Sequence, residues 1–477
     1  MMMWQMAEHI SSSSHRRRRS SLLSSMKTAS QASDDTLRTK IAEGRSNYQL
    51  VKTRSMSSKT SAYVEASETV DSPLLKLESS PMMMMGKGIT TMQFYKGSKD
   101  DASTFLKERL RLIAEQNPWI CASLVKDPKQ HGKLIALRYS TKSISIDNIF
   151  KVDPSLKVSQ DMPYQEIIQT VKKSDVHVDT GYALCKSGDP ITKCTIASSG
   201  TDDTFVVFFS ISHACADGFT YFTILNMLFE GAEVYPLDAV RNEKHRTTLP
   251  ELVGKKANKW MTSASCGQIM NFIGIMCCGK KKQPVHCFFV DKNKLADAKE
   301  KAKEGPNAPE FVSTNDILTS TFGRTTNARL LTMAMDFRGR VDGLTKKTAG
   351  CYHAGLLFDP DAYSTPGNIR QALAGPAPQS RVASFPSCCG SVFGNWTALI
   401  SNWGSASKGN YDIPGCEHLL HIPYVQTNDM PVDFSIVFKP RKGETAVMLG
   451  FQYGKNVVDI AKAQMPIGQT LSENMFS

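Results

Sequence analysis

The chain has 477 residues, of which 41% are hydrophobic and 21% are charged, and its formal net charge is +12. This composition is typical of a folded globular protein, and the length exceeds what a single hydrophobic core usually organises, so we expect two subdomains. Eleven Lys and Arg against four acids fall in residues 1–60. Beyond them no basic stripe alternates with aromatic residues, which argues against a nucleic-acid-binding protein.

Residues 1–87 are predicted to form a disordered tail. Fourteen serines fall in the first sixty residues, with an arginine run at 16–19 and a methionine tract at 82–85. The first thirty-three residues hold a single acid, Glu8, which is also the composition of an organelle transit peptide. A solvated tail explains the composition equally well, so organelle targeting remains an alternative.

The cysteines indicate a reducing compartment. There are twelve, without a Cys-x-x-Cys pair, although Cys277-Cys278 and Cys388-Cys389 are adjacent. The N-terminus lacks the continuous apolar core of a secretory signal. We therefore expect reduced thiols and a cytoplasmic protein.

From residue 88 onward, strand and helix patterns alternate. The first half, residues 88–248, is predicted to contain strands at 89–95, 119–125 and 133–139 and an amphipathic helix at 101–116. Two further strands, at 191–197 and 204–211, flank a polar loop and predict a hairpin.

Residues 249–284 are the predicted crossover between the two halves. They include an apolar run, 269–278, followed by three lysines. The run is about half the roughly twenty residues that a membrane span needs. A buried helix that leads into a solvated loop is the preferred interpretation, and membrane-surface contact or palmitoylation is the alternative.

The second half, residues 285–477, repeats the mixture of strands and helices. Ser313 is a good N-cap for a helix at 314–325. A charged helix is predicted at 291–304, and strands are predicted at 285–290, 329–340, 351–358, 397–403, 432–438 and 445–451. Both halves thus predict an α/β protein with two layered subdomains.

The most informative feature is the end of the strand at 204–211. It leads into His213, with Asp217 and Gly218 following and then an apolar helix at 219–229. A strand end holds an imidazole rigidly where a substrate can reach it. The short spacing lets Asp217 fix the turn, and Gly218 leaves backbone room for a ligand.

This His-x-x-x-Asp-Gly pattern resembles the signature of the CoA-dependent acyltransferases, which include the BAHD and chloramphenicol acetyltransferase-like enzymes. Further similarities are the strand at 335–340, which resembles the Arg-x-Arg strand of the family, and Ile400-Ser401-Asn402-Trp403, which looks like its Ser/Trp strand. Tyr352-His353-Ala354-Gly355 stands where the family often has Tyr-Phe-Gly-Asn. The Asp-Phe-Gly-Trp-Gly motif of plant BAHD enzymes is missing, which indicates a divergent member.

The resemblance implies an α/β (α+β) fold with two chloramphenicol-acetyltransferase-like subdomains. Each would be a mixed sheet flanked by helices, with the active-site channel between them. It also implies direct attack of an alcohol or amine acceptor on a thioester in a ternary complex. The mild positive charge suits a ligand with several phosphates, such as CoA.

Roles for individual residues follow from this reading. Neutral imidazole suits the removal of a proton from the acceptor, so His213 is the expected general base. The resemblance implies that Asp217 pairs with an arginine, with Arg338 as the first candidate and Arg340 as the second. Ser401 and Trp403 are, by resemblance, the candidates to stabilise the oxyanion, with a merely packed Trp403 as the alternative.

Two other chemistries are less favoured. Cys215 is two residues from His213, but in a tight turn the two side chains should diverge, which argues against a covalent Cys-His route. His418 and His421 follow Glu417 at a spacing unlike that of a zinc helix, so no metal site is expected.

We therefore expect a monomeric acyltransferase with acyl-CoA as co-substrate, a small-molecule alcohol or amine acceptor and no permanently bound cofactor. One alternative of the same fold is a condensation-type domain fed by a carrier protein, although Ser212 stands where such domains carry a second histidine. Others are a wax-ester-synthase-like enzyme and a non-catalytic acyl-CoA-binding protein. A basic-tailed nucleic-acid-binding protein is a distant alternative.

Overall fold

The structure, a computed structural model, describes residues 69–127, 129, 134–200, 203–262, 284–304, 308–375, 377–385, 397–426, 432–451 and 457–476. All of these belong to one compact unit. Residues 1–68 of the predicted tail, the apolar run at 269–278 and the Cys388-Cys389 pair lie outside the described residues.

The first large sheet has five strands, in the order β12-β2-β7-β6-β5. Its members are β2 (Ile89–Lys96), β5 (Phe150–Lys157), β6 (Thr192–Ser198), β7 (Thr204–Ile211) and β12 (Glu417–Pro423). β6 and β7 form the predicted hairpin, and β5 joins β6 in parallel. β12 comes from the second half of the chain and pairs with β2, so the two halves are interlaced.

The second large sheet has seven strands, in the order β10-β9-β11-β13-β14-β8-β15. Its members are β8 (His286–Val290), β9 (Leu330–Asp336), β10 (His353–Phe358), β11 (Thr397–Asn402), β13 (Asp433–Phe438), β14 (Ala446–Gly450) and β15 (Ile467–Thr470). β11 runs parallel to both of its neighbours, whereas the other pairs are antiparallel. Both sheets are therefore mixed, as the resemblance implied.

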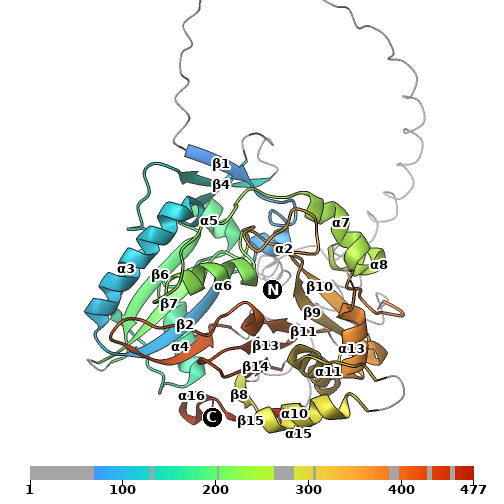
Figure 1. Cartoon of the computed structure of the whole chain (residues 1–477). Coiled ribbons are helices and arrows are strands. Elements are labelled where there is room, and N and C mark those ends of the chain that lie inside the picture. The colour runs from blue at the N-terminus through green and yellow to red at the C-terminus, as the bar shows by residue number, and fades with distance from the viewer. Residues whose placement is uncertain are drawn as a thin grey trace, which may run out of the picture. The chain divides into compact units, whose positions relative to one another are not determined.

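Helices flank both sheets (Figure 1). Up to residue 262 they are α2 (Pro81–Met84), α3 (Lys99–Gln116), α4 (Tyr164–Lys172), α5 (Gly181–Ser187), α6 (Gly218–Met227), α7 (Lys244–Val253) and α8 (Lys255–Thr262), the last of which lies in the predicted crossover. In the second half they are α10 (Lys292–Lys301), α11 (Thr314–Thr326), α12 (Pro360–Tyr363), α13 (Pro366–Leu373), α15 (Val457–Gln464) and α16 (Glu473–Phe476). Ser313 caps α11 in a capping box with Asp316, which confirms the predicted N-cap.

β7 is buried on both faces, which explains its continuous apolar sequence. Phe205, Val207, Phe209 and Ile211 join the core shared with α3 and α6. Val206 and Phe208 point the other way, into a core that also contains Phe434 and Ile436 of β13. Because side chains alternate along a strand, this one strand links the core of the first half to the core between the two sheets.

Residues 69–87 are ordered, although the sequence places them in the disordered tail. β1 (Thr69–Pro73) pairs with β4 (Ile135–Ser140), and β3 (Ser123–Lys126) completes a three-stranded sheet. Leu74, Leu75 and Met84 are buried in this part of the chain. The disordered tail was predicted mainly from the composition of residues 1–60, which does not describe this short apolar segment. The expectation of disorder therefore does not hold for residues 69–87.

Other departures are local. The strand predicted at 119–125 begins as a 3-10 turn, η1 (Pro118–Cys121), because the proline sets the first turn. Among the elements that were not predicted are β5, α4, α5 and β12. The sequences of β5, α5 and β12 lack a clear apolar period, whereas α4 has the period of an amphipathic helix, with Tyr164, Ile167, Ile168 and Val171 buried. No helix among the described residues has the length and hydrophobicity needed to cross a membrane.

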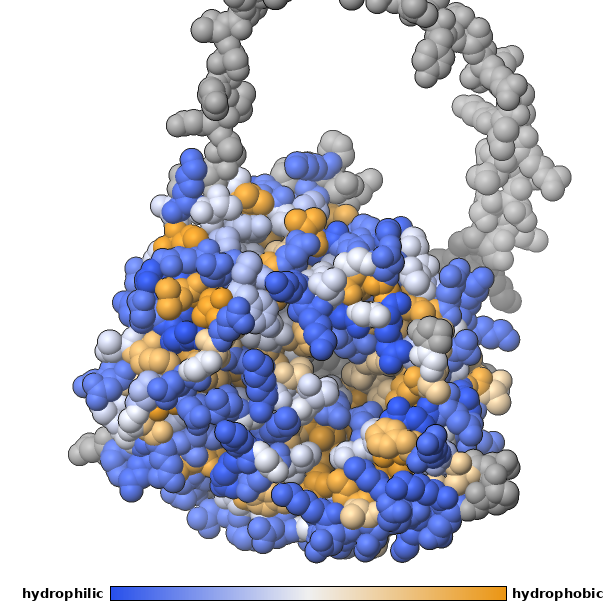
Figure 2. All heavy atoms as spheres, in the orientation of Figure 1, coloured by the Kyte–Doolittle hydropathy of each residue, from blue (hydrophilic) through white to orange (hydrophobic). Residues whose placement is uncertain are grey.

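The surface in this orientation is mostly hydrophilic, with hydrophobic residues in small patches spread over the face (Figure 2).

Candidate active site

His213 lies immediately beyond β7, which is hydrogen-bonded on both sides by β2 and β6. Ser212 extends the hairpin by one bond, from its N–H to the carbonyl of Ile191 at 2.8 Å. The chain then turns, and the Nδ1 atom of His213 lies 3.1 Å from the carbonyl oxygen of Ala216. Since a carbonyl only accepts, Nδ1 carries the proton and Nε2 keeps its lone pair.

Asp217 is the N-cap of α6, where its Oδ1 atom accepts the N–H of Thr220 at 2.9 Å. The Arg338 guanidinium donates to both carboxylate oxygens, at 2.8 and 3.2 Å, and the Tyr352 N–H donates to Oδ2 at 2.9 Å. Burial would raise the pKa of Asp217, but Arg338 holds it at about 2. The carboxylate is thus charged and fully bonded, so its role in this arrangement is to fix the turn.

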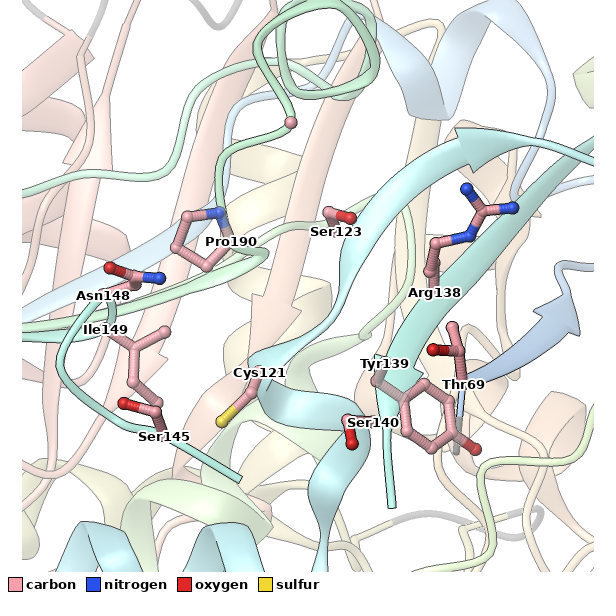
Figure 3. Close-up of a pocket in the computed structure, with 11 residues that line it drawn as sticks. Thr69, Cys121, Ser123, Arg138, Tyr139, Ser140, Ser145, Asn148, Ile149 and Pro190 are labelled. Atoms are coloured by element: carbon pink, nitrogen blue, oxygen red, sulfur yellow. The ribbon is translucent and has the colours of Figure 1, made fainter. Parts of the chain in front are cut away.

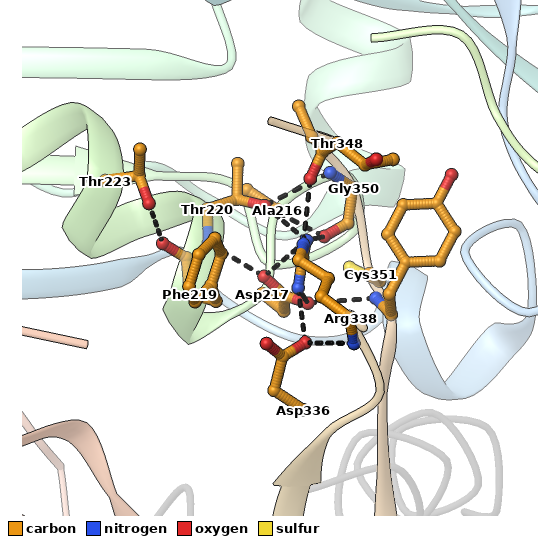
Figure 4. A network of polar contacts seen from close by, with 12 residues as sticks. Ala216, Asp217, Phe219, Thr220, Thr223, Asp336, Arg338, Thr348, Gly350 and Cys351 are labelled. Carbon is orange, nitrogen blue, oxygen red and sulfur yellow. Dashed lines mark hydrogen bonds and ion pairs between the residues drawn. The ribbon is translucent and has the colours of Figure 1, made fainter. Parts of the chain in front are cut away.

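Arg338 is equally well bonded (Figure 4). It also donates to the carbonyls of Thr348 and Gly350 and to the carboxylate of Asp336. The side chains of Arg338 and Asp217 are only 1% and 2% exposed. This pair joins the end of β9 to the start of α6, and thereby connects the second half of the chain to the turn after His213.

Gly218 and Arg340 occupy the edges of this arrangement. A Cβ atom at Gly218 would meet nothing within 4 Å, so open space lies beside it. The Arg340 side chain donates to the carbonyl of Gly375 at 3.3 Å and takes no part in the Asp217 pair.

A second buried ion pair supports the same turn from the other side. Glu78 and Arg241 lie 2.8 Å apart, with side chains 0% and 3% exposed. Arg241 donates to the carbonyl of Cys215 at 2.9 Å, and Glu78 accepts the N–H of Cys351 at 2.9 Å. Sequence reasoning missed this pair, because Glu78 sits in the segment that was assigned to the tail.

A second imidazole faces His213. His353 is the first residue of β10, and the two ring centroids are 5.4 Å apart with a tilt of 34°. Burial and, to a smaller extent, the neighbouring His353 lower the pKa of His213 to about 4. Burial also lowers the pKa of His353. The one sequence signal for His353 was its position where the family often has phenylalanine.

Ser401 and Trp403 lie at the end of β11 and contact each other. The indole N–H of Trp403 donates to the Ser401 hydroxyl oxygen at 3.1 Å. The Trp403 ring packs on Phe222 of α6, with centroids 5.8 Å apart. Trp403 therefore bridges the two halves by packing, and its N–H is already used.

Strand register places Ser401 and His353 on the same face of the seven-stranded sheet. Ile400 and Leu356 both pair with Met333, and all three belong to the core on the other face. Because paired residues share a face and neighbours alternate, Ser401 and His353 point away from that core.

The thiols near the turn are not poised as nucleophiles. Cys215 donates to the carbonyl of Ser212 at 3.4 Å, and burial raises its pKa to about 12. Cys351 donates to the carbonyl of His213 at 3.2 Å, and burial raises its pKa as well. A thiolate is the reactive form, so neither cysteine suits a covalent route.

Among the residues that the structure describes, no cluster of three or more His, Cys, Asp or Glu side chains could hold a metal ion. His418 and His421 belong to β12 instead. His421 stacks on Tyr411 at 4.5 Å, and its Nδ1 atom lies 3.1 Å from the Gln93 amide. Burial lowers the pKa of His418 to about 4.

A polar pocket of about 330 Å³ lies at the small sheet, apart from the residues discussed so far (Figure 3). Its lining includes Arg138, which pairs with Asp71 at 2.8 Å, and Cys121, whose pKa burial raises to about 12. Neither group is available for acid–base chemistry, and His213 does not line the pocket.

No family model matches this sequence, and no curated protein is significantly similar to it. Solved structures are similar in fold. TRI101 of F. graminearum, in complex with coenzyme A and deoxynivalenol, has a TM-score of 0.54 at 12% identity, covering 83% of this chain and 97% of that one. TRI101 of F. sporotrichioides, in complex with coenzyme A and T-2, has a TM-score of 0.54 at 13% identity, covering 84% and 100%.

Vinorine synthase has a TM-score of 0.50 at 12% identity, covering 84% of this chain and 93% of that one. At such identities the likeness concerns the fold alone. The chain shares the fold of these structures, a mixed α/β fold with two large mixed sheets.

Proposed function

We propose that this protein is an acyltransferase that moves an acyl group from acyl-CoA to an alcohol or amine acceptor, with His213 as general base. The observation that carries the proposal is the anchored imidazole of His213. Its Nδ1–H is bound to the Ala216 carbonyl, so Nε2 is the free basic nitrogen. A base held in one tautomer at the end of a rigid strand is what proton abstraction requires.

The reaction proceeds by direct attack. Nε2 of His213 takes the proton of the acceptor while the acceptor oxygen or nitrogen bonds to the thioester carbon, and the carbonyl electrons move to oxygen. The tetrahedral intermediate then collapses, the C–S bond breaks, and the CoA thiolate takes the proton back from His213. No covalent enzyme intermediate forms, in keeping with the buried Cys215 thiol.

Ser401 is assigned to the developing oxyanion. Its oxygen accepts the Trp403 N–H, so its own hydroxyl proton remains for the substrate. Trp403 is then a positioning residue. Asp217, Gly218 and Arg338 shape the turn that presents His213, and Arg340 lies outside this network.

The CoA donor and small-molecule acceptor are supported by the similar structures of TRI101, which hold coenzyme A with deoxynivalenol or T-2. They share only the fold with this chain.

The test is thiol release from a panel of acyl-CoAs with pooled alcohol and amine acceptors. We expect acceptor-dependent release by the wild type and its loss in His213→Ala. His286→Ala is the matched control, since His286 lies on β8 and contacts Phe288. Release that His213→Ala leaves unchanged would remove His213 as the base, and CoA binding without release would indicate a binding protein of this fold.

A further inference from the structure

Two imidazoles meet at the proposed site, and the mechanism above uses only one of them. His353 lies 5.4 Å from His213, measured between ring centroids, and comes from the opposite half of the chain. It shares a sheet face with Ser401, which the proposed mechanism places at the oxyanion. The Trp403 N–H, the other donor expected from the sequence, is occupied by Ser401.

The hydrogen bonding of His353 defines its tautomer. Its Nδ1 atom is buried and has no hydrogen-bond partner in the described part of the chain. A buried N–H without a partner is less tolerable than a buried acceptor without one, because the unpaired donor is the rarer and costlier case. The neutral ring therefore places its proton on Nε2 and leaves Nδ1 bare.

Burial lowers the pKa of His353, which favours its neutral form. Asp336 is its direct partner across the β9–β10 ladder, and its carboxylate is held by Arg338. Asp217 and Arg338 lie near the ring; Asp217 raises the pKa of His353 and Arg338 lowers it. His353 in turn lowers the pKa of two nearby imidazoles, those of His213 and His245. A neutral imidazole can donate a hydrogen bond to a developing oxyanion without giving up its proton, which is a known electrophilic use of histidine.

Resting on the proposed function, we propose that His353 is a further catalytic residue whose Nε2–H donates a hydrogen bond to the thioester oxyanion, beside Ser401. The proton transfers of the reaction are unchanged. His213 takes the acceptor's proton and returns it to the CoA thiolate, while His353 binds the oxyanion as the intermediate forms and releases it when the carbonyl is restored.

The matched variants are His353→Phe, which keeps an aromatic ring without a donor, and His353→Gln, which restores an N–H. Each is assayed as full-length protein for thiol release under saturating and limiting acyl-CoA. We expect His353→Phe to lower kcat by about 10²-fold with little change in KM, as for other lost oxyanion donors. His353→Gln should recover part of that loss, and thermal melting should show that both variants fold.

The outcomes separate the two proposals. Suppose that the wild type releases thiol and that this release needs His213. Acyl transfer then stands. The role of His353 would nevertheless be overturned by full kcat in His353→Phe, or by a kcat that is equally low in His353→Phe and His353→Gln. No release by the wild type would overturn acyl transfer and His353 with it. A second readout needs no turnover. In ¹⁵N NMR of histidine-labelled protein, the signal of His353 is identified by its absence in His353→Phe. It should be that of the Nε2–H tautomer, and an Nδ1–H tautomer would refute the inference.

Discussion

The Arg338 guanidinium binds both oxygens of the Asp217 carboxylate, although the two residues are 121 positions apart in the chain. Neither side chain is more than 2% exposed. The contact therefore makes the geometry of the turn after His213 depend on a residue from the other half of the molecule.

Removing Arg338 should destabilise the protein strongly. Arg338→Met leaves Asp217 charged, buried and unpaired, and we expect a loss of about 3–5 kcal/mol in the free energy of unfolding. Urea denaturation measures it. Lys244→Ala is the control, because its ion pair with Asp342 is 63% and 86% exposed, and its loss should cost no more than about 0.5 kcal/mol. Equal effects of the two changes would contradict the structural role of Arg338.

Glu78 should matter for the same reason. Glu78→Gln leaves Arg241 without its buried partner, so a loss of about 3–5 kcal/mol is expected on the same denaturation assay. The comparison variant is Glu108→Gln, which breaks an exposed pair with Arg111 on α3. If Glu78→Gln unfolds at the same urea concentration as Glu108→Gln, the buried pair of Glu78 and Arg241 contributes nothing to the stability of the fold.

Cys215 should be dispensable for chemistry. Burial keeps its thiol protonated, with a pKa of about 12, so Cys215→Ala should retain thiol release within about threefold while His213→Ala loses it. Mass spectrometry of the wild type mixed with acyl-CoA should find no acylated protein. An acylated Cys215 peptide, or a loss as large as that of His213→Ala in a folded variant, would favour the covalent route.

The activity should persist at unusually low pH. The proposed base, His213, works only when neutral, and its pKa is lowered to about 4 by burial and by His353. As the pH falls, kcat/KM should therefore hold steady through pH 6.5 and drop to half near pH 4. A histidine with its ordinary pKa would lose half of its activity near pH 6.5.

The effect of His353 on this profile has a definite sign. Removing the second imidazole takes away an influence that lowers the pKa of His213, so in His353→Phe the half-point should move to higher pH. A half-point that stays in place would show that the two rings are not coupled.

The hairpin and its histidine could be predicted from the sequence because the evidence is local. β7 is a run of apolar and β-branched residues, and the change to a polar turn at His213 marks its end. The same holds for α11, whose N-cap and apolar face lie within one stretch.

What could not be predicted depends on contacts distant in sequence. Glu78 pairs with a residue 163 positions later, and nothing near Glu78 indicates this. His353 contacts His213 only because β10 begins beside the turn after β7. This contact depends on how the two halves of the chain pack together, which the local sequence does not indicate. β12 carries the buried His421, the half-buried His418 and a register shift, so its strand pattern is obscured.

The pairing of β12 with β2 has a consequence for how the chain folds during synthesis. Phe94 and Leu420 are partners in this ladder, so the first sheet is incomplete until almost the whole chain has left the ribosome. Until then one edge of β2 is an open template for another chain, and such long-range strand pairing is slow to form. Residues 88–248 produced alone would keep that edge exposed and would self-associate.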